Sequence, residues 1–348
     1  MGRDQMVHVG SKMDIWHSSQ TSQRLSEIAR DTSRAEFTRL AGLDFSLEKV
    51  QLEYQGKPVK DVYGIHVVGE TEPLRGVAVG RVYELVQPSR LLDMSDAVLA
   101  ADSAAYRDVG GTLFDKRKAW LNIRLGGESR IVRGGKAAAA FDGGTDVSLP
   151  NLLLSTTFDA SQNTVVARSL IRAVCQNTIN MAADSGNACW IRHTKSQDGK
   201  LFDAVKALEV AYKELSEGTE LFQGLADTPM ERNAARGFFA MLLTETETLE
   251  EATAKIRKAK ESAPRTFSSW EDQGSLLMGL FERGTGNFGQ DRYDALNAVT
   301  EYIDHQRARI RAYRGKTATQ QADHRLDSTQ FGSGAATKRR AVRLLSRN

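Results

Sequence analysis

The pattern of apolar and polar positions changes character near residue 200. Before it, short runs of β-branched and aromatic residues lie between glycines and prolines, which predicts strands. After it, apolar residues recur every three or four positions, which predicts helices. Strands followed by helices indicate an α+β fold: a strand-rich N-terminal half, built as a twisted antiparallel sheet with packed helices, and then a helical C-terminal half.

The same pattern assigns elements to residue ranges. Strands are expected at 45–54, 62–69, 76–86, 105–114, 117–125, 129–133, 151–158, 163–172 and 188–194. Helices are expected at 21–42, 88–100, 173–184, 200–224, 227–260, 273–283, 290–314 and 333–346. The remaining stretches predict a mobile loop at 134–146, a break between helices at 264–272 and a polar linker at 315–330.

A chain of 348 residues is long enough for one large domain or two modest ones. The elements group into four expected regions: a poorly ordered N-terminus at 1–20, an α+β sheet domain at 21–199, a helical region packed on it at 200–314, and a polar linker with a basic tail at 315–348.

Polar side chains concentrate between Asn151 and Lys195, where a predicted hairpin is followed by a predicted helix. Arg168 and Arg172 lie four apart on one predicted strand and therefore project from the same face. Further hydrogen-bond donors follow at Gln176, Asn177, Asn180, Arg192, His193 and Lys195. Such donors, with almost no carboxylates among them, suit a phosphate backbone and base edges.

Two interpretations of this stretch stay open. In the first, the donors bind an anionic ligand, and Lys116 and Arg117 at a turn extend the track. In the second, the amides satisfy buried backbone groups and the arginines pair with acids elsewhere in the chain.

Charge is distributed unevenly along the chain. From His305 onward there are eleven lysines and arginines against two aspartates, a net charge of +9, so the rest carries −6 of the total of +3. Such asymmetry indicates a polyanionic partner, for which nucleic acid is the first candidate. Within the tail, Lys338, Arg339, Arg340 and Arg343 would add non-specific affinity, although a solvated basic helix has the same composition.

Other functional classes find little support in the sequence. No apolar run approaches the ~20 residues that cross a bilayer, and the first thirty residues carry no secretory signal. Two cysteines cannot form a disulfide framework, which fits a reducing cytoplasm. Histidines and cysteines lack zinc spacing and no nucleophile motif is present, so neither a metal nor another cofactor is expected.

The string GTGNFG at residues 284–289 matches the dinucleotide fingerprint letter for letter. That fingerprint requires a preceding strand, which aims the loop at the pyrophosphate. Here the preceding residues SLLMGLFER have a helical pattern, so the string is predicted to be a loop between two helices.

Several runs resemble the phage- and plasmid-borne family of domain of unknown function 932. They are RAVCQNTIN at 172–180, IRHT at 191–194, LNAVTEYIDH at 296–305 and FGSGAATKRRAVRLL at 331–345. AGLDF at 41–45 and VYELVQPSR at 82–90 look like the first half of that family, so the similarity extends over about residues 35–345. The resemblance implies a mobile genetic element but no assigned activity.

These observations predict a nucleic-acid-binding protein of a phage or plasmid, acting in the bacterial cytoplasm. Single-stranded DNA is the favoured partner and strand annealing a related activity, by a loose analogy with the sheet, packed helix and basic groove of phage annealing proteins. A homo-oligomer is also expected. The chain is expected to be a binder and not an enzyme. The alternatives are a metal-dependent nuclease, with carboxylate pairs such as Asp93 and Asp96 holding Mg²⁺, and a protein-interaction module that counters host defence.

Overall fold

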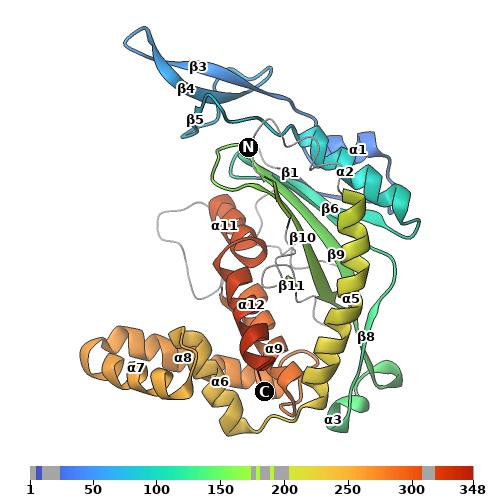
Figure 1. Cartoon of the computed structure of the whole chain (residues 1–348), viewed down its shortest axis with the longest axis vertical. Helices are drawn as coiled ribbons and strands as arrows, with labels where there is room; N and C mark the ends of the chain where they lie inside the picture. The colour runs from blue at the N-terminus through green and yellow to red at the C-terminus, as the bar shows by residue number, and fades with distance from the viewer. Residues whose placement is uncertain are drawn as a thin grey trace.

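The computed structural model describes residues 5–9, 24–173, 178–180, 189–191, 204–307 and 318–347 (Figure 1). Within them, nine strands form one sheet in the order β11-β10-β9-β7-β6-β1-β2, with β8 beside β9 and β12 beside β10. The strands are β1 (Gln5–Val9), β2 (Arg24–Ile28), β6 (Tyr106–Leu113), β7 (Lys118–Arg124), β8 (Ser129–Val132), β9 (Thr145–Thr157), β10 (Thr164–Arg172), β11 (Thr178–Asn180) and β12 (Cys189–Ile191). The pairing is antiparallel except between β1 and β2.

A smaller sheet of β3 (Leu47–Tyr54), β4 (Lys57–Val67) and β5 (Val79–Gly80) extends from one end of the molecule (Figure 1). Its buried residues Ile65, Val67 and Val79 join the same apolar core as α1 (Arg34–Leu40) and α2 (Pro88–Ala101). The small sheet is therefore anchored to the main sheet through these two helices.

Alternate residues of the central strands face two different cores. Leu152, Leu154 and Val166 belong to the core that includes α1 and α2, while Leu153 and Val165 pack with Leu326 of α11 (Ala318–Gln330). Strand residues alternate between faces with a period of two, so both faces of β9 and β10 are covered. This explains why the described part of β10 is buried at every position.

The helical half forms its own core, which also contacts the sheet. Its elements are α5 (Ala204–Asp227), α6 (Arg232–Thr244), α7 (Leu249–Ser262), α8 (Pro264–Arg283), α9 (Arg292–Glu301), the π-helical turn η3 (Tyr302–Gln306) and α12 (Ser333–Leu345). Phe222, Phe239 and Leu296 are central to this core, which Ile131 and Leu170 of the sheet also enter. In Figure 1 the antiparallel helices α6, α7 and α8 extend away from the sheet as an arm.

The α+β prediction is confirmed, and so are the hairpin of β9 and β10 and the helices α2 and α12. The dinucleotide-like string 284–289 forms the connection between α8 and α9, as predicted. Pairing also occurs at 5–9, inside the region expected to be poorly ordered. The rest of 1–20, apart from these strand residues, lies outside the described residues.

Seven predicted element ranges were wrong. The expected helix at 227–260 divides into α6 and α7, because Glu245 takes a left-handed backbone conformation that ends α6. The expected strand at 76–86 is a strand only at Val79–Gly80. Residues 178–180 form strand β11 and not a helix, because the edge of β10 offers unpaired backbone groups. Residues 264–272 are the start of α8 and not a break, because proline suits the first helical turn. The expected linker contains α11, the expected helix at 21–42 divides into β2 and α1, and the expected loop at 134–146 contains the short helix α3 (Gly135–Ala138) and the turn η2 (Asp142–Gly144).

Candidate nucleic-acid interface

The two arginines of the hairpin lie on the same face of β10, and both are buried. Arg168 is 8% exposed, and burial lowers the pKa of its guanidinium to about 10, although Glu217 of α5 acts in the opposite direction. Arg172 is 1% exposed. Both side chains are therefore almost inaccessible to solvent.

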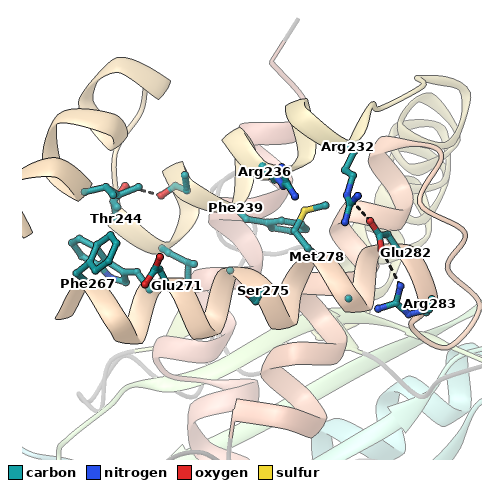
Figure 2. Close-up of a pocket in the computed structure, with 16 residues that line it drawn as sticks. Arg232, Arg236, Phe239, Thr244, Phe267, Glu271, Ser275, Met278, Glu282 and Arg283 are labelled. Carbon is teal, nitrogen blue, oxygen red and sulfur yellow. Dashed lines mark hydrogen bonds and ion pairs between the residues drawn. The ribbon is translucent and has the colours of Figure 1, made fainter. Parts of the chain in front are cut away.

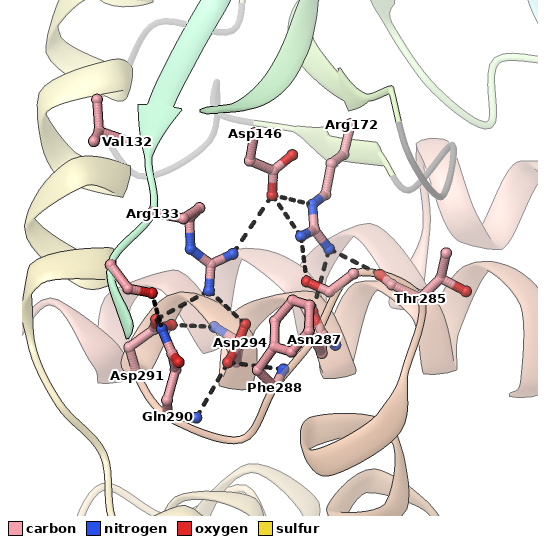
Figure 3. Close-up of polar contacts among 12 residues, drawn as sticks. Val132, Arg133, Asp146, Arg172, Thr285, Asn287, Phe288, Gln290, Asp291 and Asp294 are labelled. Atoms are coloured by element: carbon pink, nitrogen blue, oxygen red, sulfur yellow. Dashed lines mark hydrogen bonds and ion pairs between the residues drawn. The ribbon is translucent and has the colours of Figure 1, made fainter. Parts of the chain in front are cut away.

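The guanidinium of Arg172 has all of its N–H groups directed at protein acceptors (Figure 3). Its Nε donates to Asp146 Oδ2 at 2.7 Å, and Nη2 also lies 2.5 Å from that oxygen. The other donors reach the backbone oxygens of Thr285 and Gly286 and the side-chain oxygen of Asn287. Arg172 therefore fastens the end of the sheet to the loop between α8 and α9.

Arg133, just after β8, extends this network to α9. Its Nη2 lies 2.6 Å from Asp294 and 2.9 Å from Asp291, and its Nη1 lies 3.5 Å from Asp146 (Figure 3). Burial acts to lower the pKa of Arg133, but Asp291 and Asp294 outweigh it and raise that pKa. For Arg172, the structure therefore matches the second interpretation of the sequence, in which the arginines pair with acids elsewhere.

The cations at the predicted turn are only half-buried, and each has a protein partner. Lys116 pairs with Glu70 at 3.1 Å, with its ammonium 5.0 Å from the ring centre of Phe45. Arg117 donates from Nε to the backbone oxygen of Phe114 at 3.0 Å. This turn thus remains near the surface.

The tail cations are divided between the core and the surface. Lys338 is completely buried against Asp304, and this burial lowers the pKa of its ammonium. Arg340 and Arg343 both pair with Glu247, at 2.7 and 3.0 Å. Arg339 is half-buried.

The remaining predicted residues are mostly beyond what the structure describes. Gln176, Asn177, Arg192, His193 and Lys195 lie outside the described residues. For Asn180, the backbone pairs with Ser169 across β10 and β11.

A groove on the helical arm brings together residues that lie outside the predicted site. It has a volume of about 530 Å³ and lies between α6, α7 and α8 (Figure 2). The two long walls are antiparallel, since Arg232 at the start of α6 pairs with Glu282 at the end of α8 at 2.8 Å. From Phe267 to Arg283, at 1.5 Å per residue, the α8 wall is about 24 Å long.

One end of this α6–α8 groove is rich in arginine. Arg232 and Arg283 share a single carboxylate, Glu282, while Arg236 makes no ion pair or hydrogen bond to any described residue. Glu271 is the other acid that lines the groove. All three arginines are exposed, so an anion can reach them from solvent.

The other end and the floor of the groove are aromatic. Phe267 and Trp270 are half-buried, and Phe239 and Met278 form a buried floor. In Figure 2, Phe267 lies at the opposite end of the groove from Arg283. Between these two ends, the α8 wall carries the small residues Gly274, Ser275 and Gly279.

The sequence carries a helical spacing for both walls of the groove, but the predicted break at 264–272 divided the pattern on α8. Arg232, Arg236 and Leu243 recur on one face of α6, as do Phe267, Trp270 and Ser275 on α8. Because a break was predicted at 264–272, the first two turns of α8 were not expected to be helical. The aromatic side chains of this wall were therefore not placed on a helix. The pairing of α6 with α8 depends on tertiary packing and leaves no local signal.

No three His, Cys, Asp or Glu side chains in the described ranges gather closely enough to hold a metal ion. Among the helices of those ranges, none is long and apolar enough to span a bilayer.

The architecture is that of an α+β protein with a helical arm, and the comparison with known families agrees with the resemblance seen in the sequence. The model of the domain of unknown function family DUF932 matches residues 77–330, most of the chain, so the chain belongs to that family. No curated protein and no solved structure matches the chain.

Proposed function

We propose that the protein binds single-stranded nucleic acid in the α6–α8 groove. The observation that carries the proposal is the alignment of exposed arginines and half-buried aromatic rings along one groove about 24 Å long. Non-specific single-strand binders combine these two elements: cations that follow the phosphates and rings on which the bases stack.

The composition of the groove favours a single strand over a duplex. Phe267 and Trp270 can stack only on bases whose faces are exposed, and a duplex hides those faces. Arg236 makes no ion pair with any residue that the structure describes, so a phosphate that binds there breaks none of the described ion pairs. A linear ligand fits the groove because its cationic and aromatic ends are separated along α8.

The test is a fluorescence-anisotropy titration of the full chain with a labelled single-stranded oligonucleotide at two salt concentrations. Binding should weaken steeply with salt, and Arg232→Ala with Arg236→Ala should reduce the slope by about 0.7 for each lost phosphate contact. Trp270→Ala should lower affinity at both salt concentrations by about tenfold, since stacking of one base contributes roughly 1–3 kcal/mol.

Arg130→Ala is the matched control, because Arg130 is an exposed arginine that does not line the groove and pairs with Glu128 at 2.7 Å. Equal binding by the groove variants and the control would overturn the proposal. Incubating the labelled strand with protein and Mg²⁺ or Mn²⁺ separates a binder, which leaves the strand intact, from a nuclease.

A further inference from the structure

A second cavity, of about 430 Å³, lies next to the α6–α8 groove. Leu243 and Trp270 line both cavities, so the indole of Trp270 belongs to the wall between them. The second cavity is lined by the start of α8, the end of α6, the π-helical turn η3 and α12. Because it lies beside the aromatic end of the groove, a ligand that ends at Trp270 would reach it.

Two arginines from distant parts of the chain line this second cavity, which we call the Arg265–Arg307 pocket. Neither guanidinium makes a hydrogen bond or ion pair with any described residue. This separates them from Arg172, whose donors are all used inside the protein. Two guanidinium groups that line one cavity and have no partner among the described residues supply a double positive charge to a ligand in that cavity.

Neutral polar groups complete the lining. Tyr302 donates its hydroxyl to Gln273 at 2.8 Å, and Thr266 and Ser269 lie in the first turns of α8. That helix begins at Pro264 without a side-chain cap, so the positive end of its dipole is directed to the same region. Glu245 is the acid that lines the pocket, and it is exposed.

We propose that the Arg265–Arg307 pocket binds a phosphate monoester, and, resting on the proposed function, that it receives the phosphorylated end of the bound strand. A monoester carries a charge of about −1.5 to −2 at neutral pH and three acceptor oxygens, which match two guanidinium groups and neighbouring hydroxyls. A phosphodiester within the strand carries a single charge and uses two of its oxygens for chain links. The pocket thereby distinguishes a phosphorylated end from internal positions.

The experiment compares three versions of one single-stranded oligonucleotide, with a 5′-phosphate, a 3′-phosphate or hydroxyls at both ends, in titrations of the full chain. A nucleoside monophosphate is titrated separately as the free monoester. One phosphorylated version should bind roughly tenfold more tightly than the hydroxyl version, as expected for added charge-assisted hydrogen bonds. Arg265→Gln with Arg307→Gln should bring that ratio close to one.

Arg257→Gln is the matched control, since Arg257 is exposed on α7 and lines neither cavity. Circular dichroism of each variant, and the single substitutions beside the double one, exclude loss of folding as the cause. The control should keep the full preference for the phosphorylated end.

The outcomes separate this inference from the proposed function. Equal binding of all three oligonucleotides, or a preference that survives the double substitution, overturns the inference while strand binding itself stands. Binding of the nucleoside monophosphate that depends on both arginines, without binding of any oligonucleotide, supports the pocket and overturns the proposed function. Absence of both kinds of binding overturns both.

Discussion

The buried network around Arg172 and the α6–α8 groove use the same side chain for opposite purposes. In the network, Arg133 and Arg172 are enclosed by Asp146, Asp291 and Asp294 and are almost inaccessible to solvent. In the groove, exposed arginines outnumber the carboxylates that line it. Whether an arginine serves the fold or a ligand is therefore decided by the acids around it.

The difference has an energetic consequence. Burying a charge is tolerable only when partners satisfy it, so each arginine of the network depends on its aspartates and they depend on it. Exposed arginines remain hydrated and contribute little to stability. The network should therefore control folding, and the groove should control binding.

Removing a network arginine should have the largest effect on stability. Arg172→Ala leaves Asp146 with its second partner, Arg133, only at 3.5 Å, and should lower the free energy of unfolding by about 3–5 kcal/mol. Urea denaturation followed by circular dichroism measures this change. Arg130→Ala should change it by no more than about 0.5 kcal/mol. Equal effects of the two substitutions would remove the distinction between the regions.

Removing a groove arginine should have the converse effect. Arg236→Ala should change the free energy of unfolding by less than about 0.5 kcal/mol, because its guanidinium makes no ion pair or hydrogen bond with described residues. In oligonucleotide titrations it should reduce the slope of log affinity against log salt by about 0.7. A large loss of stability would show that Arg236 stabilises the fold and contradict its assignment to binding alone.

Three arginines in and just after α12 offer an intermediate case. Desolvation acts to raise the pKa of Glu247, but Arg340, Arg343 and Arg347 outweigh it and hold that pKa below its usual value. Glu247→Gln should release these arginines and strengthen low-salt binding of a single strand by roughly two- to threefold. Anisotropy titrations before and after the substitution test this. Unchanged or weaker binding would exclude α12 from the interface.

The smallest effect concerns a pair on the small sheet between the half-buried His66 and the exposed Glu48. Hydrogen bonding of His66 to Glu48, and then to the backbone oxygen of Glu70, raises the pKa of the imidazole above 6.5. This pair therefore stabilises the fold fully below pH 6.5, and the contribution is lost as pH rises through the folded pKa. An NMR titration of the His66 ring should show the raised value, and Glu48→Gln should lower it. If the pKa of His66 is the same in Glu48→Gln as in the unchanged protein, the hydrogen bond to Glu48 does not raise it.

Much of the fold could be predicted because its signals are local. Turn residues between β9 and β10 and proline at the start of α2 act within a few positions, and both elements form as expected. The errors arose where packing outweighs composition. The polar helix α11 is stabilised by Leu326 against the sheet and by Asp327 bonded to Lys118 at 2.6 Å. Residues 318–330 therefore resemble a linker in sequence although they form a helix.

For the candidate sites, the sequence predicted the residue types but not their partners. The sequence by itself determined the α+β order, the family and the abundance of arginine. It could not show that Arg172 meets Thr285 and Asn287, more than a hundred positions away, or that Arg232 meets Glu282. Only the tertiary structure decided which arginines are enclosed by acids and which remain open to an anion, because ion-pair partners are selected by proximity in space, and periodicity reports only on near neighbours along the chain.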